Sequence, residues 1–272
     1  MTTGPIGIFD SGYGGLTILK EIRKVLPEYD YIYLGDNARS PYGTRSFATV
    51  YQYTRQCVQW FFEQGCPLVI LACNTASAKA LRTIQQTDLL RYPEKRVLGV
   101  IRPTSEIIGS FSKTGNVGIL ATPGTVSSDS YVLEINKFFP QIRVLQQACP
   151  MWVPLIENGE TDNPGADFFF RKGVEELFAQ CPDIDTILLG CTHYPLIEAR
   201  IRSLLPQKVT LVAQGNIVAK SLEVYLQRHG ETARNCAREG KTRFVTTDDP
   251  QTFDMQAAKF YGEPIRSEHL DL

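Results

Sequence analysis

The fold is decided by one stretch, Pro67-Leu68-Val69-Ile70-Leu71-Ala72-Cys73-Asn74-Thr75-Ala76-Ser77-Ala78. Its apolar run predicts a buried strand, and the small residues from Thr75 onward predict the first turns of a helix. Cys73 and Asn74 therefore lie where the carboxyl end of a strand meets the N-terminus of a helix. In an open α/β sheet, ligands bind at that edge. The stretch thus predicts an α/β sheet with a binding site at its edge.

A second stretch repeats this arrangement much later in the chain. It reads Thr186-Ile187-Leu188-Leu189-Gly190-Cys191-Thr192-His193-Tyr194-Pro195, again an apolar strand followed by a cysteine, a hydroxyl residue and a helix start. A single cysteine at a strand end is usually a small buried hydrophobic residue. Because Cys73 and Cys191 occupy the same structural position, we favour a functional interpretation of the pair.

Both stretches belong to a wider and degenerate internal repeat. Residues 7–15 reappear as residues 118–126, so a glycine turn comes first in each half and a cysteine turn comes later. We therefore expect an α/β protein of two similar flavodoxin-like domains with mostly parallel sheets, related by pseudo-two-fold symmetry. The expected first domain is discontinuous, 1–100 plus 214–272, and the expected second domain is 101–213.

Apolar periodicity and turn residues predict the remaining elements. Further strands are expected at 5–9, 31–34, 96–100, 116–120, 142–146, 208–212 and 243–246. Helices are expected from the first glycine turn to about residue 25, and at about 45–64, 166–180 and 215–228. The polar segment 231–240 is expected to be a loop, and the last strand and helix are expected to return to the first half.

Length, charge and cysteine content disfavour several classes of protein. A chain of 272 residues suits two domains of ordinary size, and a formal net charge of −1 without a Lys/Arg run argues against nucleic-acid and membrane-surface partners. The first five residues lack the features of a signal peptide, and no apolar run approaches membrane length. Seven cysteines without a CxxC pair fit reduced cytosolic thiols. With three histidines and no ligand spacing, no metal site is expected.

The turn after the first strand, Asp10-Ser11-Gly12-Tyr13-Gly14-Gly15, allows a dinucleotide interpretation, with Asp36 as the acid that binds ribose. Two features disfavour this interpretation. Thr17 stands near the position where the third glycine of the dinucleotide motif belongs, and the charge of Asp10 would repel a pyrophosphate.

Two further positions stay open on the residues alone. Tyr42, in the turn Pro41-Tyr42-Gly43, is either a surface aromatic residue or part of the edge that carries Asp10 and Cys73. Glu157 is either a solvent-facing acid or a site carboxylate, and the sequence around it favours the first interpretation.

Four motifs together resemble the glutamate racemases of the aspartate/glutamate racemase family: Phe9-Asp10-Ser11-Gly12-x-Gly14-Gly15-Leu16-Thr17, Pro41-Tyr42-Gly43, Ala72-Cys73-Asn74-Thr75-Ala76 and Gly190-Cys191-Thr192-His193-Tyr194-Pro195-Leu196. The similarity covers nearly the whole chain, and the two cysteine motifs are highly specific as a pair. Two turns depart from the family pattern. Arg102-Pro103-Thr104 replaces an acid-Pro-Gly-like turn, and Ala213-Gln214-Gly215 replaces an Asp-Ser-Gly-like turn. Both departures concern local loop geometry or regulation rather than the cysteine motifs.

The resemblance implies an isomerase that interconverts L- and D-glutamate without a cofactor, in the cleft between two α/β domains. It implies a cytoplasmic enzyme that supplies D-glutamate for bacterial peptidoglycan, with a small-molecule substrate and neither a nucleic-acid nor a membrane partner. A homodimer is compatible with it. The catalytic residues that it implies are Cys73, Cys191, Asp10, His193 and Glu157. The substrate-binding residues that it implies are Asp10, Ser11, Pro41, Tyr42, Gly43, Asn74, Thr75, Thr192 and His193.

The residues themselves agree with this chemistry. Racemisation removes a proton from one face of Cα and returns a proton to the other face, so it suits two acid/base groups on opposite sides of the substrate. A free thiol has a pKa of about 8.5, and a helix N-terminus lowers it, so the helix starts after Cys73 and Cys191 are expected to favour thiolates. Hydroxyl, amide and backbone N–H donors beside the two cysteines can bind carboxylates. No lysine motif for pyridoxal phosphate is visible, so no cofactor is expected.

Three alternatives remain open at this point. An aspartate or other amino-acid racemase of the same fold would differ in the length of its pocket. A non-catalytic two-domain binding protein would close on a small ligand and would need neither cysteine. A thiol redox protein is disfavoured because the two cysteines lie in separate halves and form no CxxC motif.

Overall fold

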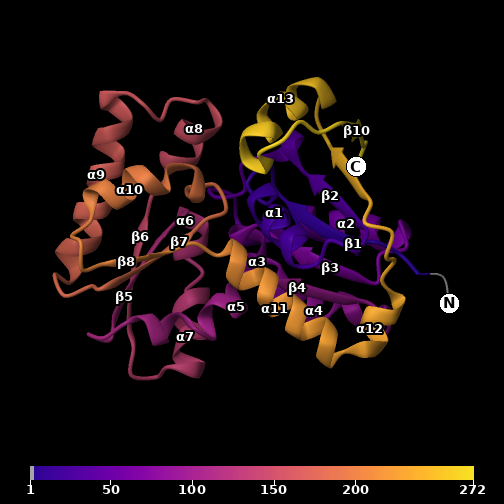
Figure 1. The fold of residues 1–272 in the computed structure, drawn as a ribbon, viewed down its shortest axis with the longest axis horizontal. Helices are drawn as coiled ribbons and strands as arrows, with labels where there is room; N and C mark the ends of the chain where they lie inside the picture. The colour runs from indigo at the N-terminus through magenta and orange to yellow at the C-terminus, as the bar shows by residue number, and fades with distance from the viewer. Residues whose placement is uncertain (1–2) are drawn as a thin grey trace.

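A computed structural model describes residues 3–272 of the chain. It contains two separate β-sheets, each flanked by helices (Figure 1). The larger sheet has the strand order β10-β9-β2-β1-β3-β4, and every neighbouring pair is parallel. Its strands are β1 (Ile6–Asp10), β2 (Tyr31–Gly35), β3 (Leu68–Leu71), β4 (Arg96–Gly99), β9 (Thr242–Thr246) and β10 (Ser267–His269).

The smaller sheet has the order β6-β5-β7-β8, also with parallel pairs throughout. This order matches β2-β1-β3-β4 when the strands of each half are counted from its start, so β3 and β7 occupy equivalent positions. The expected fold class, two mostly parallel sheets with alternating helices, is confirmed. The domain limits themselves, at residues 100/101 and 213/214, stay a prediction. The strands are β5 (Asn116–Ala121), β6 (Arg143–Ala148), β7 (Thr186–Gly190) and β8 (Thr210–Val212).

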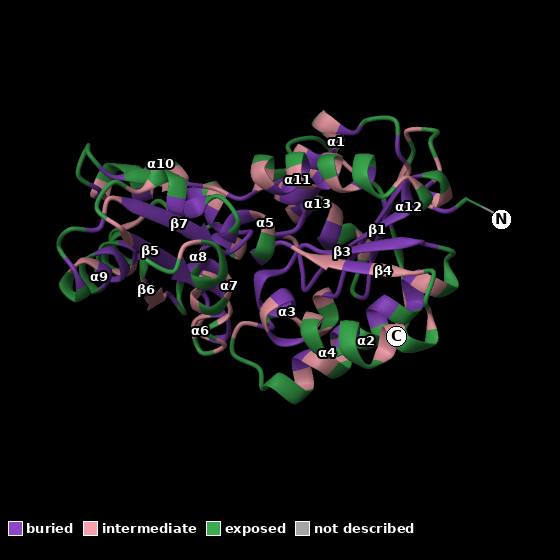
Figure 2. Cartoon of the chain, turned by 90° about the horizontal axis from the view of Figure 1, so that it is seen from below, coloured by how far each residue is buried: buried purple, intermediate pink, exposed green. Residues whose placement is uncertain are grey.

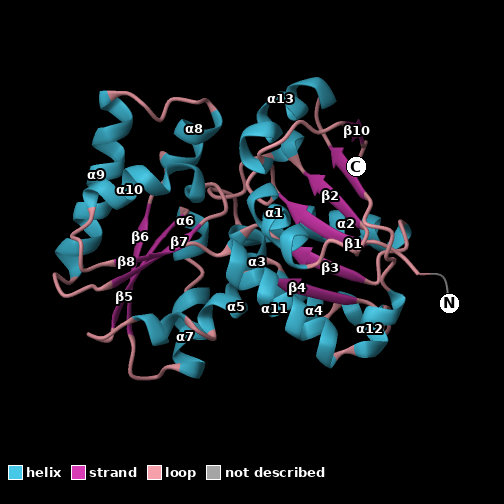
Figure 3. Ribbon diagram, in the orientation of Figure 1, coloured by secondary structure: helices cyan, strands magenta, loops and turns pink. Residues whose placement is uncertain are grey.

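Helices connect the strands and cover the sheets (Figure 3). Among residues 3–272, none of them is both long and apolar enough to span a membrane. The helices of the first half are α1 (Leu16–Val25), α2 (Phe47–Glu63), α3 (Asn74–Lys79), α4 (Leu81–Gln86), α11 (Gly215–Arg228), α12 (Gly230–Asn235) and α13 (Pro250–Tyr261). The helices of the second half are α5 (Ile101–Ser105), α6 (Pro123–Val126), α7 (Ser130–Phe138), α8 (Trp152–Glu157), α9 (Pro164–Gln180) and α10 (Glu198–Leu204). Short 3₁₀ helices are η1 (Asn37–Arg39), η2 (Asp88–Arg91), η3 (Ile108–Phe111) and η4 (Tyr194–Ile197).

Side chains of the central strand β1 alternate between the two faces of the larger sheet. Ile6 and Ile8 belong to the core cluster that contains the apolar side of α1, whereas Phe9 belongs to the cluster that contains the apolar side of α2. Both faces of the sheet are therefore buried, and Figure 2 shows buried strands between helices that are exposed on their outer sides. This double burial explains why the strands read as continuous apolar runs in the sequence.

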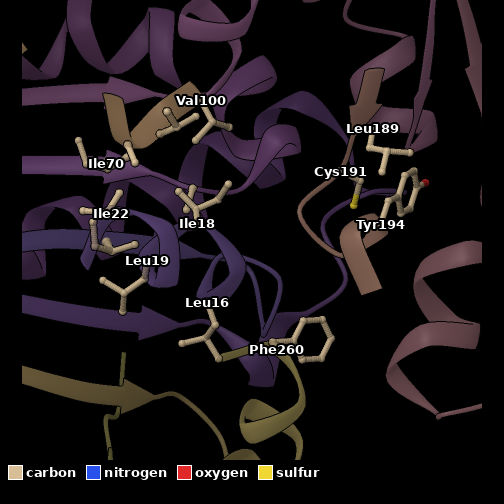
Figure 4. Packing of buried hydrophobic residues seen from close by; sticks show 14 of the residues in the cluster. Leu16, Ile18, Leu19, Ile22, Ile70, Val100, Leu189, Cys191, Tyr194 and Phe260 are labelled. Atoms are coloured by element: carbon tan, nitrogen blue, oxygen red, sulfur yellow. The ribbon is translucent and has the colours of Figure 1, made fainter. Parts of the chain in front are cut away.

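One core cluster continues through both halves of the molecule. Figure 4 shows Leu16 and Phe260 of the first half across from Leu189, Cys191 and Tyr194 of the second. Within the first half, helix α11, which follows the second crossover of the chain, packs along α1. Apolar packing therefore joins the halves in addition to the two chain crossovers.

Two elements near the C-terminus differ from the sequence-based expectation. Segment 231–240 is not entirely a loop, because its first part forms α12, in which Thr232 and Ala233 are buried. The chain then bridges Cys236 to Gly4, a tertiary contact that polar composition does not reveal. Strand β10 was not expected, since it is short and two of its three residues are exposed. The closing strand β9 pairs with β2, which confirms that the chain returns to the first half.

Asp36, at the end of β2, is a fully buried carboxylate with three partners. Arg39 Nε donates to it at 2.7 Å, Thr247 Oγ1 donates at 2.9 Å, and the Tyr42 hydroxyl also donates to it. Asp36 thus ties together η1, the turn 41–43 and the end of β9. It has a structural role here rather than that of a ribose-binding acid, and Tyr42 is a buried residue rather than a surface aromatic.

We expect Asp36→Asn to destabilise the fold, because an amide cannot accept from all three donors and leaves Arg39 without its counter-ion. The free energy of unfolding, measured by denaturant titration, should fall by roughly 1.5–3 kcal/mol, the usual contribution of hydrogen bonds to charged groups. Glu268→Gln is the control, since it removes an exposed ion pair with Arg243 and should cost less than about 1 kcal/mol. Equal losses in the two variants would contradict the structural role of Asp36.

Candidate active site

One cleft is lined by residues from both halves of the chain, and it contains all twelve site residues that the resemblance implied. These are Asp10, Ser11, Pro41, Tyr42, Gly43, Cys73, Asn74, Thr75, Glu157, Cys191, Thr192 and His193. The two thiols enter the cleft from the carboxyl ends of the equivalent strands β3 and β7. Ligands bind at this edge of open α/β sheets, so the cleft is the candidate active site.

Cys73 is the N-cap residue of α3 and is almost completely buried. Its Sγ accepts a hydrogen bond from Ala76 N at 3.4 Å and lies 3.5 Å from the hydroxyl oxygen of Ser11. Burial and the nearby charge of Asp10 raise the pKa of the Cys73 thiol to about 12, although the hydrogen bonds from Ser11 and Ala76 oppose this shift. The expectation that the helix start favours a thiolate is therefore wrong for Cys73, because desolvation outweighs the helix N-terminus.

Cys191 has different neighbours. Its Sγ lies 3.8 Å from His193 Nδ1, and His193 Nε2 lies 2.9 Å from Glu157 Oε1. Burial opposes the imidazolium, but the hydrogen bonds to Cys191 and Glu157 outweigh it and raise the pKa of His193 to about 10. His193 is therefore a cation at neutral pH, between a sulfur and a carboxylate. Glu157 lies in the cleft, whereas the sequence alone favoured a solvent-facing acid.

Asp10 is buried at the end of β1, on the side of the cleft that carries Cys73. Its Oδ1 accepts from Gly12 N at 2.9 Å, and Thr192 Oγ1 donates to its Oδ2 at 3.5 Å. Burial raises the pKa of Asp10, while the charge of His193 lowers it. Because the Asp10 carboxylate already binds an N–H of the glycine turn, this turn does not suit a pyrophosphate.

The glycine turn instead allows the two halves to approach each other. A Cβ atom on Gly14 would lie 2.4 Å from both His193 Nδ1 and Thr192 Oγ1, so a larger residue would push the second half away. Thr17 Oγ1 donates to the carbonyl oxygen of Thr192 at 2.9 Å. The same residue that disfavoured a dinucleotide motif therefore holds the two halves together.

A second set of contacts joins the halves at another edge of the cleft. The hydroxyl oxygens of Thr75 and Thr122 are 2.9 Å apart, and Gly124 N donates to the carbonyl oxygen of Gly43 at 2.7 Å. Tyr42 lines the cleft, but its hydroxyl donates to Asp36 and is already used. The sequence analysis named Tyr42 as a substrate-binding residue, but it did not show that the Tyr42 hydroxyl is bound to Asp36.

Sequence reasoning missed eight residues that line the cleft. One of them had a visible signal, because Thr122 aligns with Ser11 in the internal repeat and likewise follows the first strand of its half. The others carry no chemistry-specific pattern and enter the cleft only through the fold. The eight are Ser40, Thr44, Thr122, Pro123, Cys149, Pro150, Val153 and Pro154.

The composition of the cleft limits its chemistry. Among the residues that line it there is no Lys or Arg, so a carboxylate ligand would meet N–H and O–H donors rather than a fixed cation pair. Within the described chain, no group of three or more His, Cys, Asp or Glu side chains has the arrangement of a metal site. All seven cysteines are free thiols. The site therefore offers two separated thiols, one with a buried carboxylate nearby and one with an imidazolium.

Comparison with known proteins identifies the class to which this fold and site belong. The sequence model of the Asp/Glu/hydantoin racemase family matches residues 16–222. The chain is 40% identical to the glutamate racemase of Geobacter metallireducens over 257 residues, which covers 94% of this chain and 92% of that relative. The chain belongs to the aspartate/glutamate racemase family.

Solved structures agree with this assignment over the whole chain. A glutamate racemase isoform from Bacillus anthracis superposes with a TM-score of 0.90 at 31% identity, covering 100% of this chain and 99% of that one. The glutamate racemase from Francisella tularensis, solved in complex with D-glutamate, superposes with a TM-score of 0.88 at 32% identity, covering 100% of this chain and 98% of that one. The proteins that this chain resembles in both sequence and structure are thus glutamate racemases.

We expect the cation at His193 to make stability depend on pH. The folded-state pKa of about 10 exceeds the unfolded value of about 6.5, so the stabilisation is complete below about pH 6.5 and is lost as the pH rises through about 10. The free energy of unfolding of the wild-type protein should therefore fall relative to that of His193→Gln across this range. Denaturant titrations of both proteins at pH 6, 8 and 10 measure the difference, and a constant difference would contradict a buried imidazolium.

Proposed function

We propose that this protein is a glutamate racemase that works without a cofactor and moves the Cα proton between two thiols. The observation that carries the proposal is the position of Cys73 and Cys191, which enter one cleft from equivalent strands of opposite halves. The similarity to glutamate racemases over nearly the full length of the chain supports the choice of substrate.

The two thiols divide the proton transfer between the two faces of Cα. In the direction from L- to D-glutamate, the Cys191 sulfur takes the Cα proton, and the electron pair of the broken C–H bond passes into the adjacent carboxylate group. The Cys73 thiol then gives its proton to the opposite face of Cα. In the reverse direction, Cys73 takes the proton and Cys191 returns one. After conversion of one L-glutamate, Cys191 carries a proton and Cys73 is a thiolate. Conversion of one D-glutamate then restores the starting protonation states of both sulfurs.

The neighbours of each thiol suit these roles. Burial keeps the pKa of Cys73 high, so this thiol carries a proton that it can donate. The His193 imidazolium can donate its Nδ1–H to a negatively charged sulfur at Cys191, and Glu157 holds the ring from its other nitrogen. Asp10 lies on the other side, where it holds or shuttles the proton of Cys73. A desolvated cleft strengthens each of these electrostatic interactions.

The substrate is held by neutral donors in this proposal. The hydroxyls of Ser11, Thr75 and Thr192 and the amide of Asn74 line the cleft beside the two thiols. Donors aimed at the α-carboxylate stabilise the negative charge that develops when the Cα proton leaves. The turn 41–43 closes the same cleft from the first half.

The wider role of the enzyme is inferred from its family. We propose that it supplies D-glutamate for bacterial peptidoglycan and that it acts in the cytoplasm on a small-molecule substrate, with neither nucleic acid nor a membrane as a partner. A homodimer is compatible with this role and stays a prediction that sedimentation analysis can test.

The direct test is circular dichroism or polarimetry of pure protein with L-Glu, D-Glu, L-Asp and D-Asp. We expect both glutamate enantiomers to converge on the racemic mixture, and a thiol-blocking reagent to abolish this. Dialysis against a chelator and hydroxylamine should leave the rate intact. Faster conversion of aspartate would favour an aspartate racemase of the same fold. Turnover that survives thiol blocking, or that needs added pyridoxal phosphate, would contradict the two-thiol mechanism.

Single-thiol variants test which cysteine serves which enantiomer. A serine hydroxyl is a far weaker acid than a thiol, so Cys73→Ser and Cys191→Ser should each lower full racemisation by several orders of magnitude, on the order of 10³-fold or more. The remaining thiol can still remove its own proton and return a solvent deuteron to the same face. In deuterated water, Cys73→Ser should therefore exchange the α-proton of L-glutamate faster than that of D-glutamate, with little inversion, as measured by NMR.

The matched variant provides the control for this experiment. Cys191→Ser should show the reverse preference, with faster exchange of D-glutamate. Equal exchange of both enantiomers by either variant would indicate a single base and would refute the division of labour between the thiols.

A further inference from the structure

A closed ring of hydrogen bonds lies behind the cleft, where the chain crosses between its two halves. Asn74 Nδ2 donates to Gln214 Oε1 at 2.8 Å, Gln214 Nε2 donates to the Tyr131 hydroxyl at 2.8 Å, and the Tyr131 hydroxyl donates to Asn74 Oδ1 at 2.6 Å. All three side chains are buried, with exposed fractions of 2% or less. The ring therefore joins a cleft residue of the first half, a helix of the second half and the second crossover.

One backbone group determines the direction of every bond in this ring. Gln214 Nε2 lies 3.1 Å from the carbonyl oxygen of Val100, which can only accept a hydrogen bond. The nitrogen of Gln214 must therefore face Val100, and its oxygen must face Asn74. Asn74 in turn presents its nitrogen to Gln214 and its oxygen to Tyr131. A rotation of the Asn74 amide by 180° would bring two acceptor oxygens together, so the network itself assigns the orientation.

This orientation matters because Asn74 lines the cleft next to Cys73. One N–H of its amide group is used in the ring, and the second has no other hydrogen-bond partner among residues 3–272. We propose that Gln214 is a positioning residue, which holds the Asn74 amide so that an N–H rather than an oxygen faces a carboxylate of the substrate. In the opposite orientation, an oxygen lone pair would face that carboxylate and repel it. The inference rests on the proposed function, since it requires a carboxylate substrate in the cleft.

The sequence position of Gln214 fits this role. It occupies the turn 213–215, one of the two turns that depart from the family pattern, and a glutamine is long enough to reach Asn74, Tyr131 and Val100 from there. The other departure meets the same group, because Gln214 Nε2 also lies 3.1 Å from the hydroxyl oxygen of the buried Thr104, whereas Arg102 pairs with Glu106 on the surface.

A double-mutant cycle tests whether Gln214 acts through Asn74. Gln214→Leu keeps a similar volume but removes the donors and the acceptor. We expect it to lower kcat/KM for D-glutamate by about 10- to 100-fold, the effect of losing a hydrogen bond to a charged group. In the Asn74→Ala background, the same substitution should cost less than about 2-fold, because the amide that it positions is gone. Equal losses in both backgrounds would overturn the inference, since a purely structural role does not depend on Asn74.

Two further variants distinguish a loss of positioning from a loss of folding. Tyr131→Phe keeps the ring of the side chain but removes the hydroxyl that binds Asn74 Oδ1, so it should also lower kcat/KM in the wild-type background and have little effect in the Asn74→Ala background. Ser105→Ala is the matched control, because it removes a buried hydroxyl that donates to Ile101 O at 3.0 Å in α5, a helix that contacts α11 but lies outside the ring. Its kcat/KM should equal that of the wild type, and a loss as large as that of Gln214→Leu would overturn the inference.

The outcomes separate this inference from the function on which it rests. A wild-type protein that does not racemise glutamate would contradict the proposed function and the role of Gln214 with it. A wild-type protein that racemises glutamate, with additive losses in the cycle, would contradict only the role of Gln214.

Discussion

The close approach of the two halves at the glycine turn is the constraint on which the site depends. Gly14 lies against the turn that carries Thr192 and His193, where even a methyl group would not fit. This contact brings the carboxylate of Asp10 and the imidazolium of His193 into one electrostatic environment, although they come from different sheets. The halves could be packed well elsewhere and still form no site if this approach were a few ångströms wider.

Burial then determines how the two thiols differ. Cys73 and Cys191 occupy equivalent positions in the two sheets and are equally buried, at 6% exposure each. Cys73 has a carboxylate nearby, whereas Cys191 has an imidazolium held by Glu157. Two strands that are equivalent in topology thus deliver two chemically unequal thiols. A racemase that must remove a proton on one face and return one on the other needs such a difference between its acid and its base at any moment.

The polar residues around the cleft serve as much for architecture as for chemistry. Asp36 fixes the turn that carries Tyr42, and Gln214 fixes the amide of Asn74 from behind. Buried polar groups of this kind are stable only when every donor and acceptor is matched, and a matched network leaves each group one orientation. A backbone carbonyl can therefore orient a side chain of the cleft through an intermediate residue, as the carbonyl of Val100 orients the Asn74 amide through Gln214.

The sequence by itself determined the α/β class, the two cysteine turns and the family, because local apolar periodicity and short motifs encode strand ends directly. Strand ends also placed Asp10, Cys73 and Cys191 at one edge, and the resemblance to the racemase family supplied the other residues of the cleft that were named in advance. Only the tertiary structure decided that the Cys73 thiol is held protonated, that Glu157 belongs to the cleft and that Gln214 reaches Asn74. These properties depend on desolvation and on contacts between residues up to 140 positions apart, such as Asn74 and Gln214, and no local pattern records them.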